Sequence, residues 1–277
     1  MHTIPCLNYC DLLGREGAEI DSTLKTYERI YIGSYFCGKY FIHMNTEYLD
    51  HMLETILSEG KEKPAITLVV PMFGQRDLEE GKQKLAKLLD QYREVIDEIT
   101  VNDYGMLTYI GEVYDYPMNI GRLLMKDYRD PRYVDYYQST MQPKIFTDYF
   151  KRLRKKYRIQ GVELDPTHVS IDLSEAPEDL VIGVHGPFCY ITMGQTCEFA
   201  SVNKTIDHKY RPNSECGNEC VHYHILYHPQ EDVEWMRLGR AVYFYNPDVK
   251  ITGTSKIREI YFPVKDLKMA CKHEEVC

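Results

Sequence analysis

Segments with strand character alternate with segments of helical periodicity, and this alternation is the feature that most constrains the fold of the chain. Runs rich in β-branched and aromatic residues, bounded by turn formers, predict strands. Eight such runs occur, at residues 29–37, 65–73, 98–103, 119–124, 161–165, 180–185, 241–245 and 259–262. Apolar residues at helical spacing occur between some of them, at residues 45–59, 77–92 and 145–157.

Eight strands joined by helical crossovers predict an α/β fold, in the form of a TIM-like (β/α)8 barrel in which some units can be irregular. A doubly wound sheet is the alternative, but no GxGxxG or Walker sequence stands at a strand-to-helix junction. The length of 277 residues fits one such barrel. We therefore expect residues 1–277 to form a single domain.

The chain is acidic and has no long apolar run. Its 33 basic and 42 acidic residues give a net charge of −9, which disfavours general binding to polyanions. No apolar run approaches roughly 18 residues, and the N-terminus lacks the pattern of a signal peptide. We expect a soluble, cytoplasmic protein without membrane insertion. RNA remains an alternative partner through the basic run at residues 151–156, which we interpret as a solvated outer helix.

Nine cysteines require an explanation in such a chain. In a reducing compartment, clustered thiols bind metal or react more often than they form disulfides. Cys216 and Cys220 are separated by three residues, and Cys197 lies 19 residues before Cys216. We predict that these three bind metal. The remaining terminal cysteines are interpreted as ordinary buried residues: Cys6, Cys10, Cys271 and Cys277.

These metal candidates lie in a segment without periodicity, at about residues 187–229, which follows the sixth predicted strand. A loop of this length inside a barrel is usually functional, so we predict a cysteine-rich, cluster-binding insertion. Cys37, at the end of the first predicted strand, is the expected fourth ligand because strand ends of a parallel barrel meet on one face. Cys189 is the reserve ligand.

Two metals remain open at this point. Thiolates suit an iron–sulfur cluster or zinc. His222 and His224 follow Cys220 with the alternating spacing of a strand, which would place both on one face and would also suit zinc.

Several motifs resemble peptidase family U32, whose collagenase-like members share a glycine-and-cysteine signature. They are VHGPFCYITMGQTC at residues 184–197, NDYG at 102–105 and GRLLMKDYRDPR at 121–132. The chain is most similar to the UbiV-like iron–sulfur branch of oxygen-independent hydroxylase components. In that branch a Tyr-x-Gly-x-x-x-Cys-x-Lys stretch carries the first ligand, and residues 31–39, YIGSYFCGK, match it.

The resemblance implies a 4Fe–4S cluster on four cysteines: Cys37, Cys197, Cys216 and Cys220. It also implies a related U32-family partner subunit and an oxygen-independent hydroxylation of an aromatic small molecule or a nucleic-acid base. Two other functions stay open. The family name implies a peptidase, although the chain has no HExxH or GxSxG motif. The third alternative is a zinc-stabilised binding module.

Acid–base candidates stand at the ends of predicted strands, where the loops of a barrel build active sites. Glu163 and Asp165 alternate and share a face, so one of them is predicted to accept a proton beside His185. Asp103 completes this catalytic group. The alternative is a hydrogen-bonded polar layer that closes the barrel mouth. Three arginines are candidate clamps for a carboxylate or phosphate: Arg122, Arg129 and Arg132.

Overall fold

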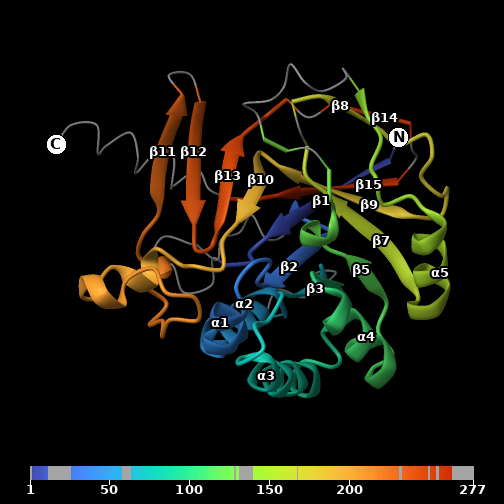
Figure 1. The fold of residues 1–277 in the computed structure, drawn as a ribbon. Coiled ribbons are helices and arrows are strands. Elements are labelled where there is room, and N and C mark those ends of the chain that lie inside the picture. Colours follow the sequence, from blue (N-terminus) through green and yellow to red (C-terminus); the bar gives the residue numbers. More distant parts are fainter. Residues whose placement is uncertain are drawn as a thin grey trace.

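The computed structural model describes residues 2–11, 26–57, 64–127, 129–130, 140–166, 168–230, 233–248, 250–253 and 256–263. Parallel strands close into an eight-stranded barrel in the order β1-β15-β9-β7-β5-β4-β3-β2 (Figure 1). The TIM-like barrel predicted from the sequence is therefore confirmed. Its strands are β1 (His2–Asn8), β2 (Arg29–Gly33), β3 (Ala65–Val70), β4 (Ile96–Val101), β5 (Met118–Ile120), β7 (Ile159–Leu164), β9 (Val181–Gly186) and β15 (Lys256–Tyr261).

Helices cover the outside of the barrel over β2 to β7 (Figure 1). They are α1 (Gly38–His43), α2 (Thr46–Leu57), α3 (Leu78–Gln91), α4 (Tyr104–Val113) and α5 (Asp148–Tyr157). In α3 the apolar residues Leu85, Leu88 and Leu89 recur on one face and are buried, as the periodicity predicted. No described helix is long and apolar enough to cross a membrane.

The predicted set of barrel strands differs from the structure at two places: one barrel strand was missed, and one predicted strand lies outside the barrel. The first barrel strand, β1, was not predicted because Pro5 and few β-branched residues hide its strand character. It nevertheless pairs in parallel with both β15 and β2. The predicted strand at residues 241–245 does form, as β13 (Ala241–Tyr245), but it lies outside the barrel. Local sequence cannot show whether a strand finds a parallel or an antiparallel neighbour.

Beyond β7 the barrel departs from the regular alternation. A small three-stranded sheet has the order β14-β8-β6 and consists of β14 (Ile251–Thr252), β8 (Ser170–Asp172) and β6 (Thr140–Met141). An antiparallel sheet in the order β10-β13-β12-β11 stands beside the barrel mouth (Figure 1). It combines β13 with β10 (Phe188–Met193), β12 (Val233–Leu238) and β11 (Ile225–Gln230).

The cysteine-rich segment at about 187–229 is therefore only partly a loop, which corrects the sequence-based prediction. It begins with β10 and ends within β11. Between them lie short 3-10 helices: η4 (Phe199–Ser201), η5 (Ile206–His208) and η6 (Glu219–Val221). This middle part, which we call the cysteine lid (residues 194–224), lies beside α1 (Figure 1).

The N-terminal part of the barrel interior is filled by an ion-pair network rather than by apolar side chains alone. Glu98 on β4 accepts hydrogen bonds from Arg258 at 2.6 and 3.2 Å and pairs with Arg29 at 3.1 Å. Thr67 and Asn119 donate to the same carboxylate at 2.7 and 2.8 Å. Burial alone would raise the pKa of Glu98, but the two guanidinium groups lower it. This buried charge is therefore fully partnered.

Candidate functional site

Cys37 sits at the junction between β2 and α1, near the C-terminal mouth of the barrel. The predicted strand 29–37 is shorter than expected and ends at Gly33, where φ is +111° and a Cβ would lie 2.3 Å from the carbonyl oxygen of Val69. Only glycine allows β2 to leave the sheet so close to β3. The chain then turns, and Cys37 becomes the N-cap residue of α1, with its Sγ accepting from the amide of Tyr40 at 3.5 Å.

The cysteine lid closes over this junction. Tyr40 of α1, Phe199 of η4 and Cys220 of η6 form a small buried cluster of their own. Cys37 and Cys197 pack against it. Residues that are far apart in the sequence thus meet at the barrel mouth, and the meeting point carries three of the four cysteines predicted as ligands.

The fourth cysteine, Cys216, lies at the edge of the same group. Its Sγ accepts from the amide of Asn218 at 3.3 Å and donates to the Glu219 carboxylate at 3.4 Å. The Cys216 thiol interacts electrostatically with Cys37, and the Cys220 thiol interacts with Cys37, Cys216 and Cys197. The structure therefore gathers all four predicted ligands in one region.

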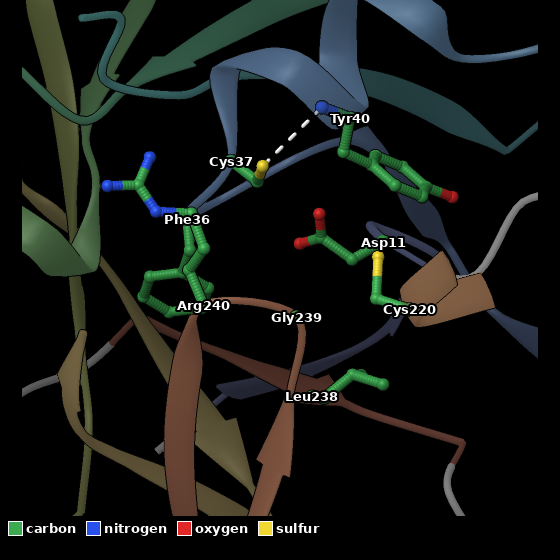
Figure 2. Close-up of a pocket in the computed structure, with 8 residues that line it drawn as sticks. All are labelled: Asp11, Phe36, Cys37, Tyr40, Cys220, Leu238, Gly239 and Arg240. Atoms are coloured by element: carbon green, nitrogen blue, oxygen red, sulfur yellow. Dashed lines mark hydrogen bonds between the residues drawn. The ribbon is translucent and has the colours of Figure 1, made fainter. Parts of the chain in front are cut away.

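A narrow pocket opens between α1, the lid and the turn between β12 and β13. Figure 2 shows Asp11 between the side chains of Cys37 and Cys220 in this pocket. Asp11 accepts from the Ser34 hydroxyl at 2.5 Å and from the amide of Tyr35 at 3.1 Å. The lining residues are Asp11, Phe36, Cys37, Tyr40, Cys220, Leu238, Gly239 and Arg240.

Burial disfavours the thiolate form of Cys37, Cys216 and Cys220. Desolvation raises the pKa of Cys37 and Cys220, and it raises the pKa of Cys216 to about 12. Neighbouring thiols add to the shift of Cys220. A bound metal would supply the positive charge that thiolates in this setting need.

The four thiols can be compared with the ligands of a single metal ion and with those of a four-iron cluster. Within the described residues, no three His, Cys, Asp or Glu side chains stand closely enough to hold one metal ion. A four-iron cluster lies between its cysteines, so its thiolates stand farther apart than those around a single zinc. Four cysteine thiols fit an iron–sulfur cluster in number and in ligand chemistry.

The two histidines do not form the predicted face of a strand. His222 ends η6 as its C-cap, and His224 precedes β11. His222 is exposed. The alternation seen in the sequence therefore lies in a turn, where it does not place both rings on one face.

Cys189 lies apart from the cysteine group. It is fully buried in β10, and its Sγ faces the Pro187 carbonyl at 3.9 Å. The charged groups that act on its thiol are Asp165 and Arg122 of the barrel mouth. Cys6 and Cys10 are buried, and Cys271 and Cys277 lie outside the described residues.

Glu163 and His185 meet inside the barrel, where the sequence predicted that either Glu163 or Asp165 would lie beside His185. The Oε2 atom of Glu163 lies 3.0 Å from Nε2 of His185 and accepts from the Tyr35 hydroxyl at 2.7 Å. Thr100 donates to Oε1 at 2.6 Å. Burial raises the pKa of Glu163 to about 7. Burial, helped by the positive charge of Arg122, lowers the pKa of His185 well below its usual value.

This pair has the acid–base properties of a proton-transfer site but is closed to solvent. Glu163 is 2% exposed and His185 is 1% exposed. The Nδ1 atom of His185 has no hydrogen-bond partner among the described residues. The neutral ring therefore donates from Nε2 to the carboxylate when Glu163 is ionised.

Asp165 shares the face of Glu163 but has a different partner. Arg122 binds its carboxylate with Nε at 3.0 Å and with Nη2. The amide of Tyr190 donates to it at 2.7 Å. Burial would raise the pKa of Asp165, but Arg122 lowers it. This predicted catalytic carboxylate is thus one half of a buried ion pair.

Aromatic rings close the barrel mouth around the guanidinium of Arg122. Its Cζ atom lies 5.3 Å from the ring centre of Tyr35 and 5.6 Å from that of Phe36. The rings of Tyr243 and Tyr190 lie at 5.7 and 6.0 Å. The polar layer and its aromatic cap match the alternative in which these residues close the barrel.

Of the remaining candidates, Arg129 contacts this network, since its Cζ atom lies 4.8 Å from the ring centre of Tyr190. Asp103 is the N-cap of α4, and its carboxylate accepts from the amide of Met106 at 2.7 Å. Arg129 donates to the carbonyls of Arg122 and Met125 at 2.9 and 2.7 Å. Arg132 is outside the described residues. The basic run at 151–156 lies on α5, on the outside of the barrel (Figure 1).

Sequence reasoning missed residues that complete both sites. Asp11 and Arg240 reach the cysteine pocket from the end of β1 and from a hairpin turn. Tyr35 and Thr100 bind Glu163. Tyr35 lies within the YIGSYFCGK motif, and that position could have marked it as a candidate. The other three carry no local signal, since only strand pairing brings them together.

The chain was compared with models of protein families, with curated proteins and with solved structures, and none of these comparisons gives a match.

Proposed function

We propose that this chain binds a 4Fe–4S cluster and serves as the iron–sulfur component of an oxygen-independent hydroxylation system, acting with a partner subunit. The observation that carries the proposal is the convergence of four thiols from the β2–α1 junction and the cysteine lid. The proposed ligands are Cys37, Cys197, Cys216 and Cys220. Their chemistry fits the cluster, because soft thiolates in groups of four are its usual ligands.

The chain's own residues would prepare such a site before a cluster binds. Gly33 and the α1 N-cap fix the backbone around Cys37. The buried contact of Tyr40 with Phe199 holds the lid against α1 and limits the access of water. When bound, a cluster of this kind accepts and gives up single electrons at a potential set by its surroundings.

Electron transfer is the role that suits a site with four thiolate ligands, because every iron then has a protein ligand. The sealed Glu163–His185 pair supports the same assignment, since a substrate reaches it only if the aromatic cap moves. We therefore propose that the partner subunit supplies much of the substrate site. The proposed substrate is an aromatic small molecule or a nucleic-acid base, and the proposed location is the reducing cytoplasm, where thiols stay free.

The test is the metal content of the full-length chain after strictly anaerobic purification. We expect about four irons and four acid-labile sulfides per chain, with a visible absorption band that bleaches in air. Cys37→Ser should lose the iron. Cys189→Ser is the matched control and should retain it, because Cys189 lies apart from the four thiols.

Other outcomes would contradict the proposal. One zinc without sulfide would identify a zinc-stabilised binding module. Absence of metal together with thiol-dependent proteolysis, unaffected by Cys37→Ser, would favour a U32-type peptidase. If Cys37→Ser retains its iron and Cys189→Ser loses it, then Cys189 rather than Cys37 is the fourth ligand.

A further inference from the structure

Arg240 is held by hydrogen bonds at the edge of the cysteine pocket. It occupies the two-residue turn between β12 and β13, where Gly239 has a φ of +57°. Its Nε donates to the carbonyl of Gly194 at 2.9 Å, and its Nη2 donates to the side-chain oxygen of Gln195 at 2.7 Å. The guanidinium is therefore anchored to the beginning of the lid.

A negative group lies in the same pocket. Asp11 is fixed by the Ser34 hydroxyl and the amide of Tyr35. Figure 2 shows Asp11 beside Cys220, with Arg240 and Cys37 lining the same space. The electrostatic influence of Arg240 on the Cys37 thiol is opposite in sign to that of Asp11. Two charges of opposite sign thus act on one proposed ligand.

We propose that Arg240 and Asp11 set the reduction potential of the cluster, with Arg240 raising it and Asp11 lowering it. This inference rests on the proposed function, because it presupposes the cluster. Reduction adds one electron and no atom, so the reduced form carries one more negative charge. A nearby cation stabilises that form and a nearby carboxylate destabilises it, and both effects are strong where water is excluded.

The test is the midpoint potential, measured by titration with dithionite as the one-electron donor and followed by electron paramagnetic resonance of the reduced form. Arg240→Gln should favour the oxidised form by about tenfold, which corresponds to about 59 mV for one electron. Asp11→Asn should shift the potential in the opposite direction. Arg240→Lys keeps the charge and should stay close to the wild type.

Arg154→Gln is the control for net charge. Arg154 lies on α5 and pairs with Asp179 at 3.0 Å, outside the cysteine site. The Arg154→Gln substitution removes one positive charge from the chain, as Arg240→Gln does, but should leave the midpoint potential unchanged.

Iron and sulfide contents separate the two proposals. A wild type without a cluster contradicts the proposed function itself. Equal cluster content with equal potentials in all variants overturns only the inference about Arg240 and Asp11. A shift of equal size in Arg240→Lys and Arg240→Gln also overturns it, because hydrogen bonding to the lid would then be responsible. If Arg240→Gln loses its iron, the midpoint potential of Asp11→Asn is the remaining test. An unchanged potential in that variant overturns the inference.

Discussion

Two groups of functional candidates lie at the mouth of this barrel, and they are built in opposite ways. In the barrel interior, Glu163, Asp165 and Arg122 find their partners on strands and turns of the barrel and are almost fully buried. In the cysteine site, Cys37 and Cys220 meet only because the lid folds over α1. In the first group, each of these charged side chains has a partner among the described residues. The second gathers four thiols that we propose as the ligands of a cluster.

This difference between the two groups predicts that substitutions in them affect different properties of the protein. Removing one partner from a satisfied buried network leaves the other charge unpaired and strongly destabilises a protein. Thiols at the edge of a lid contribute little to folding, but their loss would remove a proposed ligand. Substitutions in the barrel should therefore change unfolding, and substitutions in the lid should change metal content.

The largest effect is expected for Arg122→Met, which leaves the Asp165 carboxylate buried without its partner. We expect a loss of about 3–5 kcal/mol of unfolding free energy, measured by urea denaturation followed by circular dichroism. Arg154→Gln is the control, since its partner Asp179 is 79% exposed and the pair should contribute about 0–1 kcal/mol. Equal losses in the two variants would contradict the assigned difference between the ion pairs.

Glu163→Gln should remove a pH dependence of stability. The folded pKa of about 7 lies above the ordinary value of 4.5, so between these values the folded chain keeps a proton that the unfolded chain releases. Stability from this group is fully present below pH 4.5 and is lost as pH rises through 7. Relative to Glu163→Gln, the wild type should lose about 3 kcal/mol over that range.

The measurement is urea denaturation of both proteins between pH 5 and pH 8. His185 acts in the opposite sense, because its pKa is lowered, but it is present in both proteins. Glu112→Gln removes an exposed carboxylate on α4 and controls for the loss of one charge. A constant difference between wild type and Glu163→Gln at every pH would contradict the burial-induced shift.

Gly33→Ala should affect both regions, with an intermediate loss of stability. A Cβ at this position meets the carbonyl oxygen of Val69 at 2.3 Å, in a backbone conformation that disfavours alanine. We expect a loss of about 1–3 kcal/mol and a lower iron content, because Cys37 follows directly after this turn.

Gly239→Ala is the comparison for Gly33→Ala. It also has a positive φ, but nothing lies within 4 Å of the added Cβ. Only the backbone preference should matter there, at about 1 kcal/mol. A greater loss in Gly239→Ala than in Gly33→Ala would show that the close approach of β2 to β3 is not limiting.

The smallest change in stability is expected for Cys216→Ser. Cys216 is partly exposed, so the metal-free chain should change by only about 0.5 kcal/mol, while the iron content measured after anaerobic purification should fall. Cys6→Ser should instead destabilise the metal-free chain and keep its iron content. Cys6 is buried in β1 beside the Glu98 network and is not a proposed ligand. If both variants lose iron to the same extent, the division between the two regions is wrong.

Much of the barrel could be predicted from the sequence because its strands and helices have local periodicity. The strand at 65–73 and the helix at 77–92 are close to β3 and α3. Two strands were still placed wrongly, for different reasons. The strand β1 was hidden by Pro5, and β13 has a strand pattern that does not identify its neighbours. Pairing between distant strands leaves no local pattern.

The candidate site was predictable in composition but not in geometry. The spacing of Cys216 and Cys220 already pointed to metal, and the topology of a barrel suggested Cys37 as their companion. The sequence could not choose between Cys37 and Cys189, because both stand near strand ends. The structure places Cys37 against the lid and Cys189 against the barrel mouth.

By itself the sequence determined the class of fold and identified the cysteines proposed as metal ligands, since periodicity and side-chain chemistry are local properties. Only the tertiary structure decided that Asp165 pairs with Arg122, that Glu163 is the carboxylate beside His185, and that Asp11 and Arg240 line the cysteine pocket. Each of these contacts joins residues from separate strands or loops. Their electrostatic properties follow from burial and distance, which exist only once the barrel has closed.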